Sequence, residues 1–317
     1  MLNKFKIGHF TDNEIGTGVT VILAEDGAVG GVCVRGSAPA TRETDLLKPE
    51  KTVQKINAVV LSGGSAFGLE AASGVMDYLH EKGIGYNAGK YRVPIVSGAS
   101  LYDLEFKQFG YPDKKAGYLA VQNAKTDNFE RGCIGAGTGA TISKICGMDA
   151  AAKAGLGIQT YSLNGLEIAV IVAVNALGDI VKDGNIIAGA MTEDGNYIDC
   201  TKIMSSGSLE LKNSNTTIGC IITNAKLTKL QANILAELAH DGFALSISPS
   251  HTMFDGDAMF IMSSDDVDIE FNVLTSLIPT ITAKAIQSSV LDTGEHISKK
   301  VNKILFSVFQ KMWKPKI

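Results

Sequence analysis

The chain has few histidines, one tryptophan and no pair of cysteines at CxxC spacing among its 317 residues. The five cysteines are odd in number and scattered, which argues against a disulfide framework and suits a reducing cytosol. With histidine also scarce, a structural zinc site is not expected. The formal net charge of −4 provides no general attraction for nucleic acid. We therefore expect a cytoplasmic protein that does not bind nucleic acid.

Long apolar runs are missing too. No stretch approaches the roughly 18 uninterrupted apolar residues of a transmembrane helix, and the first residues lack the apolar region of a signal peptide. Glycine, in contrast, is abundant. Its 34 residues form short runs beside apolar segments, which predicts tight turns and close approaches of the backbone. With 45% hydrophobic and 20% charged residues, the composition is that of a soluble globular protein.

The apolar runs predict strands of two kinds. Residues 17–23 and 30–35 are expected to pair as a hairpin around the turn sequence EDGAVG. The continuous apolar run at 168–174 is typical of a strand that is buried on both faces. Residues 180–191 predict a second hairpin, with the turn at 183–185.

Helical spacing of apolar residues predicts three main helices. The first is expected to follow Ser65 as its N-cap, and the second to end at Gly242. The third, at about 267–291, is expected to be interrupted or kinked near Pro279. Hairpins, buried strands and helices follow one another without strict alternation. This order predicts an α+β fold, with a sheet core covered by helices in one compact domain.

The sequence GAGTG at 135–139 invites comparison with phosphate-binding loops, but the details disagree. A P-loop needs GxxxxGK[ST], and the dinucleotide fingerprint needs GxGxxG after a strand. Two interpretations remain. The segment is a tight turn, or its backbone N–H groups and Lys144 create a positive region beside an active site.

Three polar residues are candidates for chemistry at strand ends. Asp255 and Asp257 flank one glycine before the apolar run at 258–262. They are read as a turn, as a weak metal signal, or as carboxylates that orient a nucleophile or recognise an amine. Asn175 ends the buried run at 168–174, where it is either a turn residue or an oxyanion donor.

A nucleophile is harder to choose, because no GxSxG elbow is present. The stretch NSNTT at 213–217 carries three hydroxyl groups and leads directly into an apolar, strand-like run. Composition alone reads it as a polar loop before a strand, and it selects no single hydroxyl.

Longer stretches resemble one family, the L-aminopeptidase/D-esterase family, which also includes β-peptidyl aminopeptidases and nylon-oligomer hydrolases. The resemblance covers about residues 5–290 in consistent order. The matching stretches include GTGVTVI at 16–22, AVVLSGGSAFGLEAASGVMDYL at 58–79, GAGTGATISK at 135–144, VAVNALGDI at 172–180, NTTIGCIITNAKL at 215–227 and HTMFDGDAMF at 251–260.

The resemblance implies a precursor that cuts itself into two chains. The cut would lie between Asn215 and Thr216, and Thr216 would become the N-terminal nucleophile of the smaller chain. The implied fold is a four-layer αββα sandwich, shared with ornithine acetyltransferase-like proteins. The implied assembly is a homotetramer, and no metal or organic cofactor is implied.

The resemblance also implies roles for the other candidates. Asn175 matches the oxyanion-hole asparagine, and Lys144 matches the lysine of the nylon-hydrolase-like branch. Asp255 and Asp257 match the acidic pair of that branch, whereas the β-aminopeptidases have Ser and Glu there. The expected activity is hydrolysis of small peptides, amino amides or amide oligomers. The alternatives are an uncleaved or inactive relative that binds a small metabolite, and an acyltransferase.

The C-terminal end differs from the rest of the chain. Residues 1–292 are expected to form the hydrolase domain, with 1–215 as the larger chain and 216–292 as the start of the smaller one. Residues 293–317 are expected to be a basic amphipathic extension, because 298–317 contain six lysines and no acid. We expect this segment to dock on the acidic body or a neighbouring subunit rather than on a membrane surface or partner.

Overall fold

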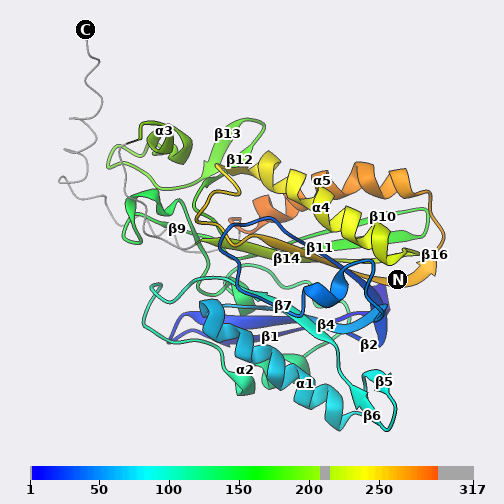
Figure 1. Cartoon of the computed structure of the whole chain (residues 1–317). Coiled ribbons are helices and arrows are strands. Elements are labelled where there is room, and N and C mark those ends of the chain that lie inside the picture. Colours follow the sequence, from blue (N-terminus) through cyan, green and yellow to red (C-terminus); the bar gives the residue numbers. More distant parts are fainter. Residues whose placement is uncertain (1, 208–214, 292–317) are drawn as a thin grey trace.

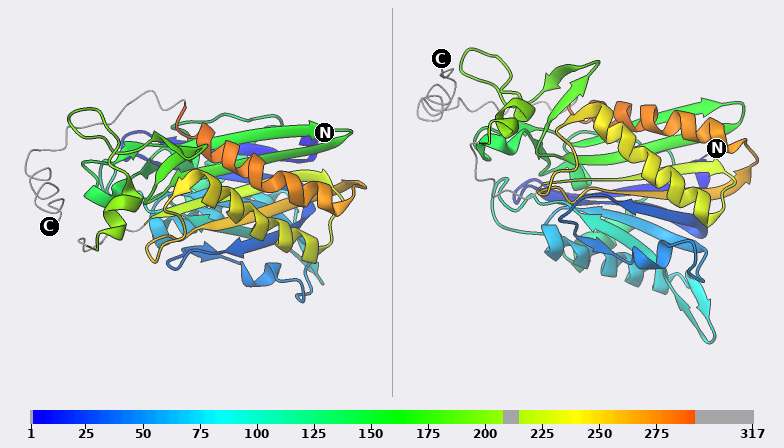
Figure 2. Two further views of the ribbon diagram at one scale, coloured as in Figure 1. Left: turned by 90° about the horizontal axis from the view of Figure 1, so that it is seen from above. Right: turned by 45° about the horizontal axis from the view of Figure 1, so that its top comes forward.

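A large mixed sheet flanked by helices forms an α+β fold in the computed structural model, which describes residues 2–207 and 215–291. Two helices cover one outer side and two others cover the opposite side, so that the sheet lies between them (Figures 1 and 2). The first pair is α1 (Ala71–Glu81) and α2 (Lys114–Gln122), and the second is α4 (Lys229–Ser246) and α5 (Phe271–Ser288).

Nine strands form the main sheet, in the order β10-β11-β14-β16-β2-β4-β7-β3, with β1 paired to β2. The pairs β14–β16 and β4–β7 are parallel, and the other pairs are antiparallel. The bounds are β1 Lys6–Asp12, β2 Thr17–Val34, β3 Thr41–Arg42, β4 Lys55–Ser62, β7 Val96–Ser100, β10 Leu156–Leu163, β11 Leu166–Asn175, β14 Thr216–Ala225 and β16 Ala258–Val267.

Shorter elements lie outside this sheet. Three small sheets and a short helix complete the strands and α-helices of the described residues. They are β5 Tyr86–Ala88 with β6 Tyr91–Val93, β8 Thr141–Ile142 with β9 Ala152–Lys153, β12 Asp179–Lys182 with β13 Asn185–Ala188 and β15 Ile247–Ser248, and α3 Cys200–Ser205. The 3₁₀ helices are η1 Leu2–Lys4, η2 Asp45–Leu47, η3 Ser65–Glu70, η4 Gly135–Gly137 and η5 Lys144–Cys146.

The predicted hairpin at 17–23 and 30–35 is wrong. Both runs, apart from Arg35, belong to the single 18-residue strand β2, and EDGAVG lies within it. The first part of β2 pairs with β1 and β4, while its second part pairs with β16. Because the register with β4 shifts between Leu23 and Ala28, the extra residues are absorbed as an irregularity rather than a turn. This strand therefore joins the two halves of the sheet.

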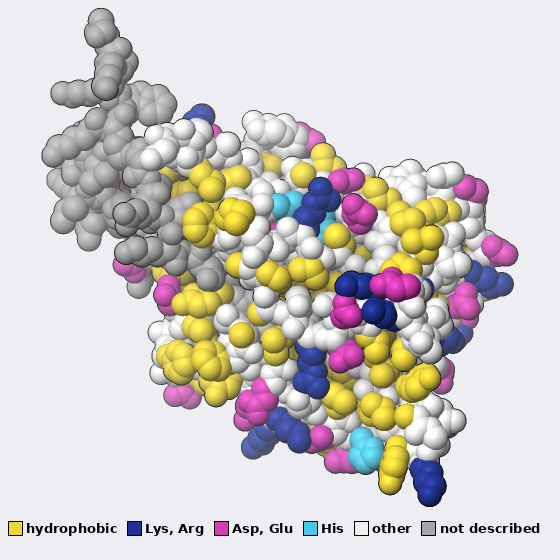
Figure 3. All heavy atoms as spheres, viewed as in Figure 1, with side chains coloured by type: hydrophobic (Ala, Val, Ile, Leu, Met, Phe, Trp, Pro, Cys, Tyr) yellow, Lys and Arg dark blue, Asp and Glu magenta, His cyan; other side chains and the backbone are white. Residues whose placement is uncertain are grey.

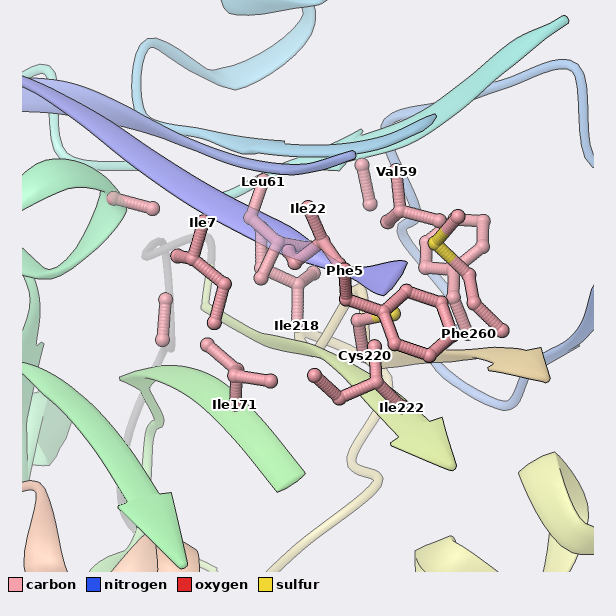
Figure 4. Close-up of a cluster of buried hydrophobic side chains, with 14 of the residues drawn as sticks. Phe5, Ile7, Ile22, Val59, Leu61, Ile171, Ile218, Cys220, Ile222 and Phe260 are labelled. Atoms are coloured by element: carbon pink, nitrogen blue, oxygen red, sulfur yellow. The ribbon is translucent and has the colours of Figure 1, made fainter. Parts of the chain in front are cut away.

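The main core lies between these two halves. Ile22 and Leu61 point into it from β2 and β4, toward Ile171, Ile218 and Cys220 from β11 and β14 (Figure 4). All five side chains are inaccessible to solvent. Burying one such aliphatic side chain contributes about 2 kcal/mol, so this layer stabilises the packing of β11 and β14 against β2 and β4. Two further clusters fill the spaces under α4 and α5 and under α1 and α2.

Two helix boundaries differ from the sequence prediction. Ser65 is not an N-cap: it is the first residue of η3, in the left-handed region (φ 53°), and α1 begins only at Ala71. Helix α4 runs past Gly242 to Ser246. A Cβ on Gly242 would lie 2.6 Å from the carbonyl oxygen of Pro279, so this glycine allows α4 to pack closely on α5.

Other expectations are confirmed. Strand β11 is buried on both faces along nearly its whole length, and β12 and β13 form the hairpin predicted at 180–191. The interruption expected near Pro279 is wrong, because α5 runs through this residue from Phe271 to Ser288. Residues 293–317 lie outside the described residues, as do Asn213 and Ser214. Within the described ranges, no helix has the length and apolar character needed to cross a membrane.

Charge on the visible surface agrees with the small net charge. On the face shown in Figure 3, acidic and basic side chains are interspersed, and neither sign forms a continuous field there. The described residues on this face form no concentrated basic region of the kind that attracts nucleic acid.

Candidate active site

The candidate residues converge where β11 ends and β14 begins. Asn175, the last residue of β11, is the direct antiparallel partner of Thr216, the first residue of β14. Both residues are almost completely buried. Paired strands hold the two side chains in a fixed relation, which an isolated loop does not provide.

The peptide bond between Asn215 and Thr216 is held from several directions. The N–H of Asn215 donates to the Phe254 carbonyl at 2.9 Å. The Asn215 carbonyl oxygen accepts from the N–H of Gly256 at 2.8 Å and from Thr216 Oγ1 at 2.5 Å. The hydroxyl of Thr216 therefore lies beside the carbonyl group that precedes it, and that group already has a backbone N–H donor.

Asn175 has a defined orientation. Its Oδ1 accepts from Lys144 Nζ at 2.7 Å and from the N–H of Thr141 at 3.1 Å. Its Nδ2 donates to the Tyr102 carbonyl at 2.8 Å. Because both donors converge on Oδ1, the amide nitrogen must occupy the other position, where it presents N–H groups.

Lys144 is buried beside Asn175, and its Nζ also donates to the Asn175 carbonyl at 3.0 Å. Burial lowers the pKa of Lys144 to about 7, although the nearby Asp255 and Asp103 carboxylates oppose this shift. The preceding Ser143 adopts φ 57°, and its hydroxyl donates to Asp179 Oδ1 at 2.5 Å. This contact fixes the segment that carries the lysine.

The two aspartates have different partners. Asp257 Oδ1 accepts from the N–H of Thr217 at 2.7 Å, and its Oδ2 is 2.8 Å from His251 Nδ1. Asp255 Oδ2 accepts from the N–H and the hydroxyl of Thr252 at 2.7 and 2.6 Å. Burial, followed by the charge of Asp257, raises the pKa of Asp255 to about 6.

The structure thus brings together all the predicted site residues, Asn215, Thr216, Asn175, Lys144, Asp255 and Asp257. The acidic pair is linked to the start of β14, because Asp257 accepts from the N–H of Thr217, the residue after the candidate nucleophile.

Sequence reasoning missed three residues that shape the site: Gly256, His251 and Asp103. Asp103 is buried and accepts from the N–H of Gly64 at 2.7 Å and from Thr17 Oγ1 at 2.8 Å. Its burial raises its pKa to about 6. No local pattern marks a lone aspartate in a loop, whereas His251 and Gly256 lie inside the recognised stretch HTMFDGDAMF and were available as signals.

The loop at 135–139 is a tight turn. The N–H groups of Gly135 and Ala136 donate to the hydroxyls of Thr11 and Thr20, so these two donors are used within the protein. Lys144, which follows the loop, does reach the site. The positive region expected beside the active site therefore comes from the lysine.

Comparisons with known proteins agree with this geometry. The family model "Peptidase family S58" matches residues 3–303. An uncharacterized aminopeptidase of Mycobacterium leprae is 34% identical, over 90% of this chain and 85% of its own. A 6-aminohexanoate-oligomer endohydrolase of Paenarthrobacter ureafaciens is 28% identical, over 88% of this chain and 81% of its own.

A solved structure has the same fold. It is the L-aminopeptidase D-Ala-esterase/amidase of Ochrobactrum anthropi, described as a variant of the Ntn-hydrolase fold. The two structures share a TM-score of 0.64 at 15% identity, over 97% of this chain and 92% of the other. The chain belongs to peptidase family S58, whose members include aminopeptidases and nylon-oligomer hydrolases, and it is a hydrolase acting on peptides or amides.

Proposed function

We propose that this chain cleaves itself between Asn215 and Thr216 and then hydrolyses small peptides, amino amides or amide oligomers with N-terminal Thr216 as its nucleophile. One observation carries the proposal: Thr216 Oγ1 lies 2.5 Å from the Asn215 carbonyl oxygen, which also accepts the N–H of Gly256. The nucleophile, the carbonyl it would attack and a donor for the developing oxyanion are side by side.

Self-cleavage is an N→O acyl shift. Oγ1 of Thr216 forms a bond to the Asn215 carbonyl carbon, and negative charge develops on an oxygen that faces the Gly256 N–H. The C–N bond then breaks, and the proton lost by Oγ1 passes to the departing nitrogen of Thr216. Water hydrolyses the resulting ester, which releases the Asn215 carboxylate and restores the Thr216 hydroxyl.

Turnover of a substrate repeats the same chemistry with a new base. The freed α-amine of Thr216 has an ordinary pKa near 8, so it can accept the proton of its own Oγ1. Asn175 stabilises the oxyanion through Nδ2, oriented by Lys144 on its Oδ1. The cationic form of Lys144 favours the neutral, base-competent amine. Water then releases the acyl group from Thr216.

We also infer a four-layer αββα sandwich of the kind found in ornithine acetyltransferase-like proteins. The inference is supported by helices on both outer sides and by a core enclosed between the two halves of the sheet. A homotetramer and a cytoplasmic location complete the proposal and follow from the family resemblance and the scattered cysteines.

Denaturing gel electrophoresis tests the cleavage directly. Chains of 215 and 102 residues, which sum to 317, should appear as bands of roughly 23 and 11 kDa in place of the 33.4-kDa chain. Thr216→Ala should remain whole. Thr217→Ala is the matched control, because it removes the neighbouring buried hydroxyl, and it should still cleave.

Turnover is tested on the cleaved protein with p-nitroanilides and aminohexanoate oligomers. Added amines or amino acids in the same assay reveal whether the acyl group passes to water or to another acceptor. A folded wild-type chain that remains whole and hydrolyses none of these substrates would overturn the proposal. Equal ligand binding by the wild type and Thr216→Ala, without turnover by either, would instead indicate a binding protein.

A further inference from the structure

His251 contacts the acidic pair through Asp257. Among the described residues it forms no hydrogen bond with Asn215 or Thr216. Its Nδ1 is 2.8 Å from Asp257 Oδ2, and its side chain is 17% exposed. The other oxygen of the same carboxylate accepts the N–H of Thr217 at 2.7 Å. A continuous path of hydrogen bonds therefore runs from the imidazole to the residue after the candidate nucleophile.

The imidazole is itself held by helix α4. The ring of Phe243 stacks on His251, with centroids 5.4 Å apart and an angle of 25° between the planes. The ring of His240 meets it edge-on at 4.9 Å. His240 Nε2 donates to the Cys33 carbonyl at 3.1 Å, and burial lowers the pKa of His240 to about 4, so that it stays neutral. Two fixed rings thus define the plane of His251.

This packing also defines the tautomer of His251. A carboxylate oxygen facing Nδ1 requires the hydrogen on Nδ1. The opposite atom, Nε2, is buried and has no hydrogen-bond partner within the described residues. Among those residues, the one polar contact of the ring is therefore the bond to Asp257, and the ring is oriented for that bond.

We propose that His251 is a positioning residue for the nucleophile, in a role that rests on the function proposed above. Its Nδ1–H fixes the Asp257 carboxylate, and Asp257 fixes the backbone at Thr217. As a result, Thr216 Oγ1 stays against the Asn215 carbonyl before cleavage and against the substrate afterwards. Misplacing a reacting group by about 1 Å costs on the order of 100-fold in rate, so small disorder at Thr217 has a measurable effect.

Two substitutions separate the hydrogen bond from the bulk of the ring. His251 has φ 55°, a backbone conformation that Asn and Gly accept. His251→Asn keeps an N–H near the position of Nδ1, whereas His251→Gly removes it without adding backbone strain. We expect His251→Asn to cleave within about 3-fold of the wild-type rate and His251→Gly to cleave about 10–100-fold more slowly.

The matured proteins provide a second measurement. In His251→Gly, kcat should fall while KM stays close to the wild-type value, because the imidazole positions the nucleophile and does not bind substrate. Wild-type rates for His251→Gly would overturn the proposal, and so would equal slowing of the Asn and Gly variants. A wild-type chain that never cleaves would count against the proposed function itself.

Nitrogen-15 NMR of labelled histidine decides the geometry if His251→Gly does not fold. The measurement uses the full-length Thr216→Ala chain, which keeps the native imidazole. We expect the His251 signal to show a proton on Nδ1. A signal from the Nε2-protonated tautomer would overturn the proposal, because that ring cannot donate to Asp257.

Discussion

Asn175 and Thr216 face each other across the antiparallel pairing of β11 and β14, the last residue of one strand against the first residue of the next. The ladder continues from this pair through seven further registered pairs. Cutting the chain before Thr216 would remove its covalent bond to Asn215 but leave the pairing of β14 with β11 intact. The strand would still hold the new N-terminus opposite Asn175, which is the property that a terminal nucleophile needs.

The first prediction concerns Asn175. Asn175→Asp keeps the Oδ1 that accepts Lys144 but replaces the Nδ2 donor with an acceptor. We expect kcat to fall roughly 100–1,000-fold, as for the loss of one oxyanion donor elsewhere. Initial rates of p-nitroanilide hydrolysis by the cleaved variant and the cleaved wild type would measure this fall in kcat.

Asn224→Ala is the matched control for Asn175. It removes another buried asparagine, which lies near the far end of β14. Asn224 Oδ1 accepts from the N–H of Glu167, and its Nδ2 donates to the Gly165 carbonyl. Its kcat should stay near the wild-type value even if stability falls. Comparable losses in the two variants would show that the effect at Asn175 is structural.

The second prediction concerns the charge of Lys144. With Lys144→Met, no cation disfavours protonation of the Thr216 α-amine, so the pH at which kcat/KM reaches half its maximum should move upward. Because burial lowers the pKa of Lys144 to about 7, the difference from wild type should be greatest on the acidic side. A pH–rate profile measures the shift.

Lys153→Met controls for the loss of a buried lysine. Lys153 Nζ donates to the carbonyls of Gly137 and Ala140, which support the glycine-rich turn. Its removal should lower stability without moving the midpoint of the profile. If both variants shift alike, the charge of Lys144 does not act on the amine.

Much of the site was readable from the sequence because its residues lie in long, distinctive stretches. Thr216, Asn175 and the acidic pair each border an apolar strand, and a strand end is a position that sequence can locate. Asp103 was not readable, because its importance comes from burial against Gly64 and Thr17, which are distant in sequence. Long-range contacts of this kind leave no local pattern.

The fold was predicted at the level of its class, and the errors have a common physical cause. EDGAVG has the composition of a turn, but β2 pairs with β4 and β16 from Ala28 onward, and the unpaired residues around Gly27 (φ 75°) form an irregularity within one strand. Gly242 resembles a helix end, but the contact with Pro279 shows why α4 needs a small residue there. In both places tertiary packing overrides the local preference of the residues.

The third prediction concerns stability and pH. The folded-state pKa of Asp255 is raised from 3.8 to about 6, so folding favours its protonated form. Its contribution to stability is therefore full below the unfolded pKa and is lost as pH rises through about 6. Asp255→Asn stays neutral throughout. The free energy of unfolding of Asp255→Asn minus that of the wild type should therefore be about 1 kcal/mol larger at pH 8 than at pH 5.

Urea unfolding at the two pH values measures this difference, with Thr216→Ala as the common background so that every chain stays whole. At pH 8 Lys144 is largely neutral, so removing the Asp255 charge leaves little unpaired positive charge. A difference that is equal at both pH values would show that Asp255 does not titrate in this range in the folded chain.

The last prediction concerns Gly256, whose N–H donates to the Asn215 carbonyl. A Cβ at this position would lie 2.5 Å from the Ala38 carbonyl oxygen and 2.9 Å from Thr216 Oγ1. The first contact is with backbone, which cannot move aside as a flexible side chain does. Gly256→Ala should therefore shift the N–H from the carbonyl, slow cleavage by at least about 10-fold and destabilise the fold by about 1–3 kcal/mol.

A control is needed because destabilisation alone can slow cleavage. Gly184→Ala supplies it. Gly184 has φ 77° in the β12–β13 hairpin, and a Cβ added there would meet nothing within 4 Å. Alanine there costs about 1 kcal/mol of backbone strain without contacting the residues of the scissile bond. Gel time courses would compare the two variants, and thermal melting would compare their stabilities. If Gly256→Ala cleaves as fast as Gly184→Ala, the oxyanion of self-cleavage depends on a donor other than the Gly256 N–H.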